Sequence, residues 1–267
     1  MPRISRATVP SVPHHTTQRG NRREKSFFNR ESCLNVQKSK NKKKSRTKAN
    51  FPERFRKKKS ILPSTGSSDV VAWYAESECF LNLAGNYNYM ELPYYYSQDY
   101  ENTDSPIHPT CEEMLDAYIP PLFLEKAKQA GMMVPEYYIS NGYFEPPMLI
   151  DPVNPFLVKS AIVRKTGREK SIARSLTRNH TYTICCQKIK EDSRIVYFRS
   201  VLGWCNVKKY RFLSLAVWNT FHIPLARVRL VTEANGDMLL SDISPLPLES
   251  LNKTERNHLD KCVQWQK

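Results

Sequence analysis

The stretch LARVRLVTEANGDMLLSDI, residues 225–243, gives the clearest local structure in this chain. Its two arms are rich in aliphatic and β-branched residues, and Asn235-Gly236 between them is typical of a type I′ β-hairpin. The preceding stretch VKKYRFLSLAVWNTF, 207–221, instead repeats its apolar residues at helical spacing. A helix that leads into a hairpin indicates a fold that combines both kinds of element.

Further strands are predicted outward from the hairpin. TYTICCQKI (181–189) and RIVYFRSVL (194–202) indicate two strands joined by the polar turn KEDS, and PFLVKSAIV (155–163) indicates a third. Two apolar runs within 68–83 predict either strands or a short helix followed by a strand near the start of the folded part. Asparagine and tyrosine alternate over 86–89, which predicts that a strand continues through these residues.

Helices are predicted from their end signals. Thr110 and Glu113 have the spacing of a capping box, which opens a helix, and a second helix ends at Gly131. A last helix is expected over 253–264. Because helices and strands mix without a regular βαβ repeat, the fold class is α+β, with a mixed or antiparallel sheet and packed helices.

The positive charge of the chain lies almost entirely in residues 1–60. They hold 19 of the 41 Lys and Arg residues against three glutamates, whereas the rest of the chain is close to neutral. This segment has too little apolar surface to offset the entropy of ordering, so we expect a disordered polybasic tail over 1–60 and one α+β domain over 61–267. The tail could contact nucleic acid or an anionic surface weakly, direct the chain to an organelle, or be a solvated extension.

The cysteines and the apolar stretches indicate a compartment. The seven cysteines show no CxxC spacing, so neither a zinc site nor a disulfide scaffold is indicated. Cys185 and Cys186 are adjacent in a predicted strand and should point to opposite faces as packing residues. No stretch is long and apolar enough for a membrane span, and we expect a cytoplasmic protein.

Several catalytic classes lack their motifs. No two glycines form GxG, which argues against a Rossmann or kinase phosphate loop, and no HExxH or GxSxG occurs. His222 follows the apolar stripe of 207–221 and is interpreted as a helix-end residue rather than a ligand. Neither a metal site nor a catalytic residue is therefore predicted.

Three segments resemble one known family. FLNLAGNYNYMELPYYYS (80–97), the stretch from Arg194 to Val231, and GDMLLSDISPLPLESLNKTER (236–256) are similar to the RimK-like ATP-grasp N-terminal domain family over roughly 68–260. The resemblance implies an α+β domain that usually precedes an ATP-grasp ligase module. Because the sequence ends at 267, we expect this domain to stand without that module and to act with a ligase in trans.

The second half also resembles a shrunken ATP-grasp module. In that alignment Lys159 would be the nucleotide lysine, Gln187 the adenine-side residue, and Asp242-Ile243-Ser244 the metal-binding motif. ATP chemistry needs an oxygen-rich magnesium site, yet Arg229 stands where an aspartate would be needed and Ser244 replaces an asparagine. A degenerate carboxylate–amine ligase, using ATP and magnesium, is thus an alternative to a domain without any cofactor.

The tyrosine-rich segment is the candidate ligand site. Tyrosines offer an aromatic wall with a polar tip, and asparagines offer directional hydrogen bonds to an amino-acid or peptide substrate. The simpler interpretation is a half-buried sheet face whose hydroxyls reach water. If a pocket exists, the residues expected to line it are Asn82, Asn86, Tyr87, Asn88, Tyr89, Tyr95, Lys159 and Arg199.

Three functions follow from these observations. The first is a non-catalytic accessory or substrate-recognition domain associated with an ATP-grasp amide or peptide ligase. The second is the degenerate ligase itself. The third is a nucleic-acid-associated protein that binds through its basic residues 1–60.

Overall fold

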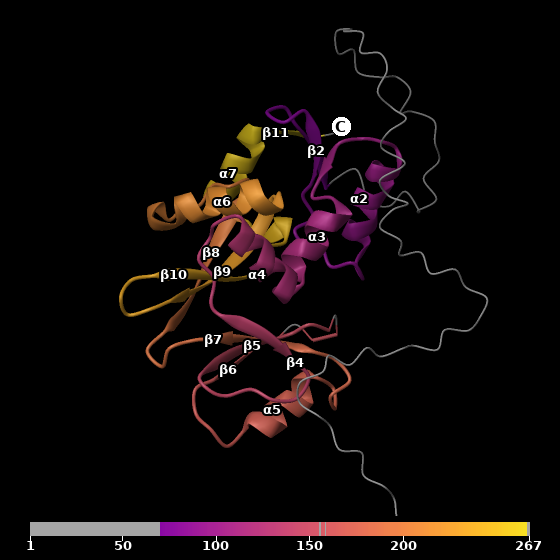
Figure 1. Cartoon of the computed structure of the whole chain (residues 1–267). Helices are drawn as coiled ribbons and strands as arrows, with labels where there is room; N and C mark the ends of the chain where they lie inside the picture. The colour runs from indigo at the N-terminus through magenta and orange to yellow at the C-terminus, as the bar shows by residue number, and fades with distance from the viewer. Residues whose placement is uncertain (1–69, 155, 158, 266–267) are drawn as a thin grey trace, which may run out of the picture. The chain divides into compact units, whose positions relative to one another are not determined.

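The computed structural model describes residues 70–154, 156–157 and 159–265. The predicted tail over 1–60 lies outside the described residues, so its expected disorder remains a prediction. Within the described part, helices pack against three sheets, of which two are antiparallel and one is mixed, and the α+β class is confirmed (Figure 1).

The first sheet contains the predicted hairpin. It has the strand order β10-β9-β8 and is antiparallel throughout. Its strands are β8 (Arg194–Val201), β9 (Leu225–Thr232) and β10 (Met238–Pro245). The type I′ turn was wrong, because Gly236 has φ +93° but Asn235 does not have a positive φ. A longer connection closes the hairpin instead, with the Gly236 amide donating to the Glu233 carbonyl and the Glu233 amide to the Asp237 carbonyl, each at 3.0 Å.

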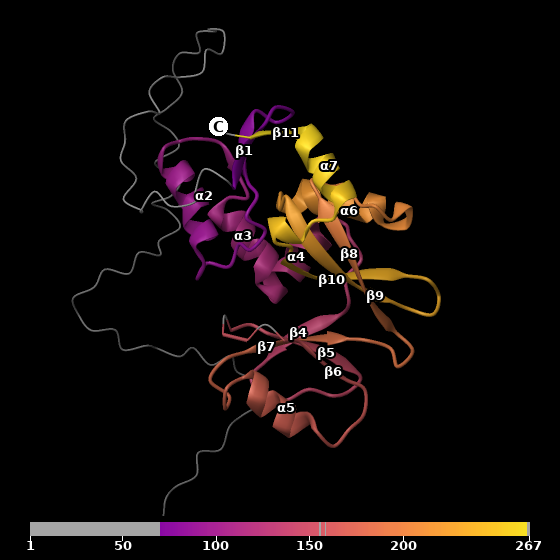
Figure 2. The ribbon, with the colours of Figure 1, turned by 180° about the vertical axis from the view of Figure 1, so that it is seen from behind.

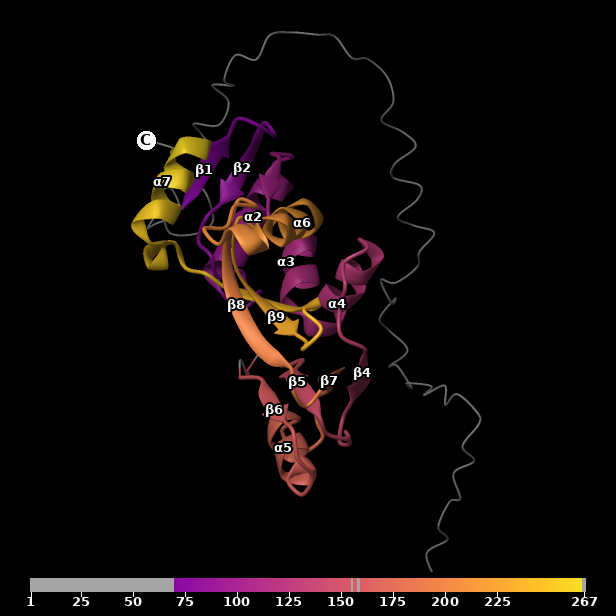
Figure 3. The ribbon, with the colours of Figure 1, turned by 90° about the vertical axis from the view of Figure 1, so that its left-hand side faces the viewer.

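The second sheet has the order β4-β7-β5-β6 and carries one helix. Its elements are β4 (Tyr137–Ser140), β5 (Met148–Pro152), β6 (Ala161–Val163), α5 (Glu169–Leu176) and β7 (Ile184–Lys188). Figure 3 shows α5 next to β6. One prediction needs correction here, because β6 is the only strand among the described residues of 155–163. The strands predicted over 181–189 and 194–202 are confirmed as β7 and β8, although β7 joins β4 and β5 while β8 joins β9.

The third sheet brings the two ends of the described chain together. Its order is β11-β1-β2-β3, from strands β1 (Val71–Tyr74), β2 (Cys79–Asn82), β3 (Ile107–His108) and β11 (Val263–Trp265). The strand β11 pairs antiparallel with β1, and Figure 2 shows the two beside α7. The last helix, α7 (Lys253–Cys262), therefore ends two residues earlier than the expected 264.

The remaining helices surround the first and third sheets. They are α2 (Leu92–Asn102), α3 (Cys111–Tyr118), α4 (Pro120–Gln129), α6 (Arg211–Phe221) and the 3-10 turns η3 (Lys208–Tyr210) and η4 (Leu248–Ser250). The capping box at Thr110 is confirmed: the Glu113 amide donates to Thr110 Oγ1 at 3.1 Å, and the Thr110 amide donates to the Glu113 carboxylate at 2.8 Å. Gly131 follows α4 with φ +78°, as expected for a helix terminator.

Two apolar cores meet at the strand β7. Cys185 belongs to the core formed by α3, α4 and α6 against β9 and β10, whereas Cys186 belongs to the core beneath α5. Neighbouring residues of a strand point to opposite faces, so the predicted role of these cysteines as packing residues is confirmed. A separate, small cluster of Leu149, Ile189 and Val231 links the first and second sheets.

Candidate functional site

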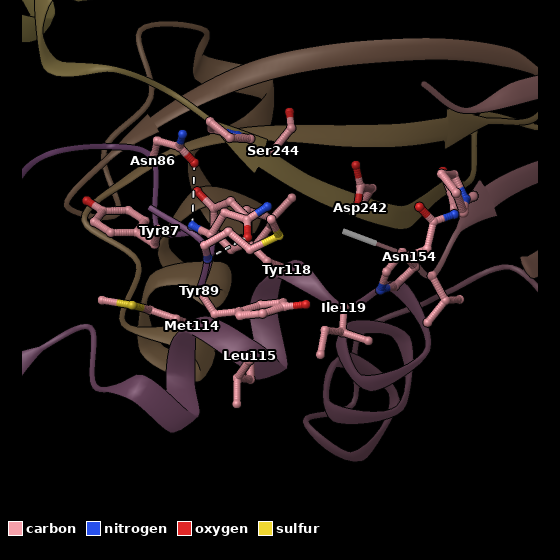
Figure 4. A pocket seen from close by; sticks show the side chains of 18 of the residues that line it. Asn86, Tyr87, Tyr89, Met114, Leu115, Tyr118, Ile119, Asn154, Asp242 and Ser244 are labelled. Carbon is pink, nitrogen blue, oxygen red and sulfur yellow. Dashed lines mark hydrogen bonds between the residues drawn. The ribbon is translucent and has the colours of Figure 1, made fainter. Parts of the chain in front are cut away.

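A cavity of about 500 Å³ lies where the first and second sheets meet the loop after β2. Four stretches supply most of its walls: the loop 86–91, residues 114–120 of α3 and α4, the end of β5 at 151–154, and the end of β10 at 242–245. Figure 4 shows Asn86 and Tyr87 at one end of the cavity and Asp242 and Asn154 at the other. The tyrosine-rich segment therefore does border a space that a small ligand could enter.

The predicted strand over 86–89 was wrong, because local hydrogen bonds fold these residues as a loop. The Asn86 side-chain oxygen accepts from the Asn88 amide at 3.4 Å, and the Asn88 oxygen accepts from the Met90 amide at 3.1 Å. Such asparagine turns compete with strand pairing. The loop starts at Gly85, whose φ is +75° and whose carbonyl accepts from the Leu246 amide at 2.8 Å. An added Cβ on Gly85 would lie 2.0 Å from the Leu246 oxygen, so only glycine fits there.

Four of the predicted ligand residues line the cavity together, namely Asn86, Tyr87, Asn88 and Tyr89. Tyr87 is only 1% exposed, and its hydroxyl donates to the Asn82 carbonyl at 2.8 Å. Its ring meets Tyr118 edge-on at 6.0 Å, so Tyr87 is a fixed part of the wall. Tyr89 is 42% exposed and has more freedom to contact a ligand. The part of each side chain in binding remains a prediction.

The other four predicted residues are not among those that line the cavity. Asn82 is fully buried and donates to the Pro93 carbonyl at 2.7 Å, which anchors the start of α2. Tyr95 lies on α2 and packs against Tyr94. Arg199 pairs with Glu255 at 2.8 Å, and Lys159 is exposed.

A buried arginine forms the polar centre next to the cavity. Arg229 on β9 is 2% exposed. Its two terminal nitrogens donate to both carboxylate oxygens of Asp151 on β5, at 2.9 and 2.7 Å. Further bonds run to Ser160 Oγ at 2.8 Å and to Ser241 Oγ at 3.1 Å. Bidentate, charge-assisted pairs of this kind are the strongest hydrogen bonds between side chains, so this one ties the first sheet to the second.

Gln187 belongs to the same network. Its amide nitrogen donates to Asp151 Oδ2 at 2.6 Å and to the Ser241 carbonyl at 3.1 Å, and its oxygen accepts from Ser241 Oγ at 2.7 Å. The side chain is fully buried, and both ends of its amide are engaged within the protein. Gln187 therefore has a structural role, and its amide is not available to bind a nucleotide base.

Asp242 is one of three acidic residues that line the cavity, with Glu91 and Asp151. It stands opposite Arg229 in the β9–β10 register, after a bulge between Leu240 and Asp242, and its carboxylate lies 3.9 Å from Arg229 Nη1. Burial raises the pKa of Asp242 to about 7, and the charge of Arg229 only partly opposes this effect. The Arg229 guanidinium thus occupies the space between Asp151 and Asp242, where its positive charge opposes a second cation.

Sequence reasoning noticed Arg229 only as a departure from a motif and missed its partners. Two local signals could have found them. Arg229 is a charged residue in the middle of the apolar strand β9, and Asp151 follows Leu149 and Ile150 in the equally apolar β5. A buried charge requires an opposite charge, so two such residues in one fold predict each other.

Comparison with known proteins agrees with the resemblance inferred from the sequence. The model of the RimK-like ATP-grasp N-terminal domain matches residues 73–262, and the chain belongs to this family. No curated protein matches it.

Solved structures provide distant matches. A RimK-domain ATP-grasp protein from Sphaerobacter thermophilus has 12% identity and a TM-score of 0.44, covering 58% of this chain and 67% of that one. The D-alanine–D-alanine ligase of Helicobacter pylori has 14% identity and a TM-score of 0.49, covering 70% and 71%. The corresponding ligase of Coxiella burnetii has 11% identity and a TM-score of 0.46, covering 62% and 58%.

Proposed function

We propose that this chain is a non-catalytic accessory or substrate-recognition domain that acts with an ATP-grasp amide or peptide ligase. The observation that carries this proposal is the position of Arg229 between Asp151 and Asp242. Membership of a family named for its place before RimK-like ATP-grasp modules supports the association with such a ligase.

The argument against catalysis by the described residues is electrostatic. ATP-dependent ligation needs Mg²⁺ to bridge the phosphates, and Mg²⁺ needs anionic oxygen ligands. Here two of the three carboxylates that line the cavity, Asp151 and Asp242, face a guanidinium that is 2% exposed. The third, Glu91, is exposed at the end of the loop 86–91. Arg229 keeps its charge at any physiological pH, because interaction with Asp242 and Asp151 outweighs the effect of burial and raises its pKa further. A magnesium ion would therefore have to displace or approach a fixed cation.

The cavity has the character of a site for an amino acid or a short peptide. Met114 and Tyr118 supply apolar and aromatic contact, while Asn86 supplies an amide group at the end opposite Asp242. In its ionised form, Asp242 can accept from the ammonium group of such a ligand. We take Tyr89, which is 42% exposed, as the side chain that closes over it.

The test is ligand-observed NMR with the full chain and pools of the twenty amino acids and of dipeptides. We expect saturation transfer to at least one pool, with the signal reduced several-fold in Tyr89→Ala and in Asp242→Asn. Tyr143→Ala is the matched control, because Tyr143 is 66% exposed and does not line the cavity. No transfer from any pool, or transfer that both cavity variants leave unchanged, would overturn the proposed substrate role.

We also propose that the chain acts in the cytoplasm. The cysteines of the described segments are all free thiols, as a reducing compartment requires. Among the described residues, no helix combines the length and apolar character needed to cross a bilayer.

Nucleic-acid contact through residues 1–60 stays a separate prediction, tested by deletion of that segment. Binding that survives the deletion would refute it.

A further inference from the structure

A cluster of two histidines and one glutamate lies apart from the cavity, where three elements converge. His108 is the last residue of β3, Glu113 is in the first turn of α3, and His222 caps the C-terminus of α6. The Nδ1 atoms of His108 and His222 lie 2.8 and 2.7 Å from the two different carboxylate oxygens of Glu113. One ligand atom from each residue lies within 4.8 Å of the other two.

We propose that His108, Glu113 and His222 form a binding site for a divalent transition-metal ion, with Zn²⁺ as the ion the ligand set fits best. Two imidazole nitrogens and one carboxylate are a known three-ligand set for zinc, which leaves the fourth position to water or another group. This site is independent of the proposed function, since it shares neither Arg229 nor the carboxylates beside it.

An ion bound here would replace the two hydrogen bonds to Glu113. They run from His108 Nδ1 to Oε2 at 2.8 Å and from His222 Nδ1 to Oε1 at 2.7 Å. A tetrahedral zinc ion with bonds of about 2.0–2.1 Å holds its ligand atoms roughly 3.3 Å apart, so the ligand atoms have to separate. The imidazole rings are stacked with centroids 4.5 Å apart, so one ring also has to turn before both Nδ1 atoms face one ion. Each ring that binds the ion through Nδ1 carries its proton on Nε2.

Charge and burial at the cluster favour a cation. The Glu113 carboxylate lies against both imidazoles and the Thr110 amide, and its side chain is 13% exposed. His222 follows the C-terminal end of α6, whose partial negative charge attracts a cation. The side chains of His108 and His222 are 29% and 37% exposed, which leaves a path for an ion to enter.

Surrounding contacts hold the ligands in place. The Thr110 amide donates to Glu113 Oε2 at 2.8 Å, so the capping box also fixes the carboxylate. Trp218 meets the His222 ring edge-on at 5.8 Å, and His222 keeps a left-handed backbone with φ +49°. Because Met114 and Tyr118 of the same helix line the cavity, a bound ion that joins α3 to α6 would also stiffen that wall.

The experiment uses the full chain, titrated with Co²⁺ under visible absorption and with Zn²⁺ in competition by calorimetry. The test variant is His108→Gln/His222→Asn, in which asparagine tolerates the left-handed backbone at 222. The matched control is His14→Gln/His15→Gln, which removes the adjacent histidine pair of the N-terminal segment. Circular dichroism without metal verifies that each variant is folded. The single variant His108→Gln is tested as well, because it leaves His222 at the C-terminus of α6 unchanged.

We expect the full chain to bind one Zn²⁺. The affinity for Zn²⁺ should fall by at least about 100-fold in His108→Gln/His222→Asn, because even residues that only support a ligand contribute about 10–100-fold. In the control His14→Gln/His15→Gln the affinity should change by less than about twofold. His108→Gln alone should lose at least about tenfold. The proposal fails if the wild-type chain takes up no Zn²⁺ or if His108→Gln/His222→Asn keeps its affinity. It also fails if His14→Gln/His15→Gln no longer binds the metal. A thiolate charge-transfer band of bound Co²⁺ that persists in His108→Gln/His222→Asn would contradict it as well.

Discussion

Replacing Arg229 by methionine tests how much the buried ion pair between Arg229 and Asp151 contributes to the stability of the fold. Methionine keeps the aliphatic length but leaves Asp151, which is 3% exposed, without its bidentate partner. Removing one member of a buried ion pair costs about 3–5 kcal/mol, because the remaining charge is desolvated and unpaired. We expect Arg229→Met to lower the free energy of unfolding by that amount, measured by urea denaturation at pH 7.

The control and the double variant separate the pair from the strand. Arg227→Met changes an exposed arginine of the same strand, which stacks on Tyr197 at 4.3 Å, and should cost no more than about 1 kcal/mol. Arg229→Met/Asp151→Leu removes both charges and should recover much of the loss of the single variant. A cost below about 1 kcal/mol for Arg229→Met would refute the account of this network, as would a double variant less stable than the single one.

Two further changes give sharp expectations. Gly85→Ala should lower the free energy of unfolding in urea by at least about 2 kcal/mol, because the added Cβ would lie 2.0 Å from the Leu246 oxygen. The control Gly131→Ala should cost less, since nothing lies within 4 Å of a Cβ added there. Equal costs for the two variants would contradict this explanation. The pKa of Asp242 is raised to about 7 in the folded chain, whereas it is near 4 in the unfolded chain. The contribution of Asp242 to the free energy of unfolding is therefore complete below about pH 4 and is lost as the pH rises through 7. Asp242→Asn should therefore flatten the decline in stability between pH 4 and pH 7, and an unchanged pH profile would show that Asp242 is ionised throughout.

Local signals in the sequence predicted most of the elements, because their causes lie within a few residues. Thr110 and Glu113 are three positions apart, and the arms of the 225–243 hairpin adjoin in sequence, so propensity and spacing were enough. The turn type was missed because Asn235 can adopt either sign of φ, and the length of the connection, not the dipeptide, determined the result.

Pairings between distant segments could not be predicted in this way. Asp151 and Arg229 are 78 positions apart, and the strands β7 and β8 follow each other in sequence yet belong to different sheets. The candidate site shows the same division. The local run 86–89 does line the cavity, whereas Lys159 and Arg199, which come from other parts of the chain, do not. Their places depend on how whole sheets pack, which no short motif records.

Calorimetric titration of the full chain with ATP and Mg²⁺ tests the central claim most directly, namely that Arg229 keeps the cavity from holding a nucleotide triphosphate with its metal. We predict no saturable heat at millimolar ATP, and no increase in thermal stability with or without the metal. Saturable, magnesium-dependent binding that Asp242→Asn abolishes would contradict the account, and it would establish the chain as an ATP-binding ligase module instead.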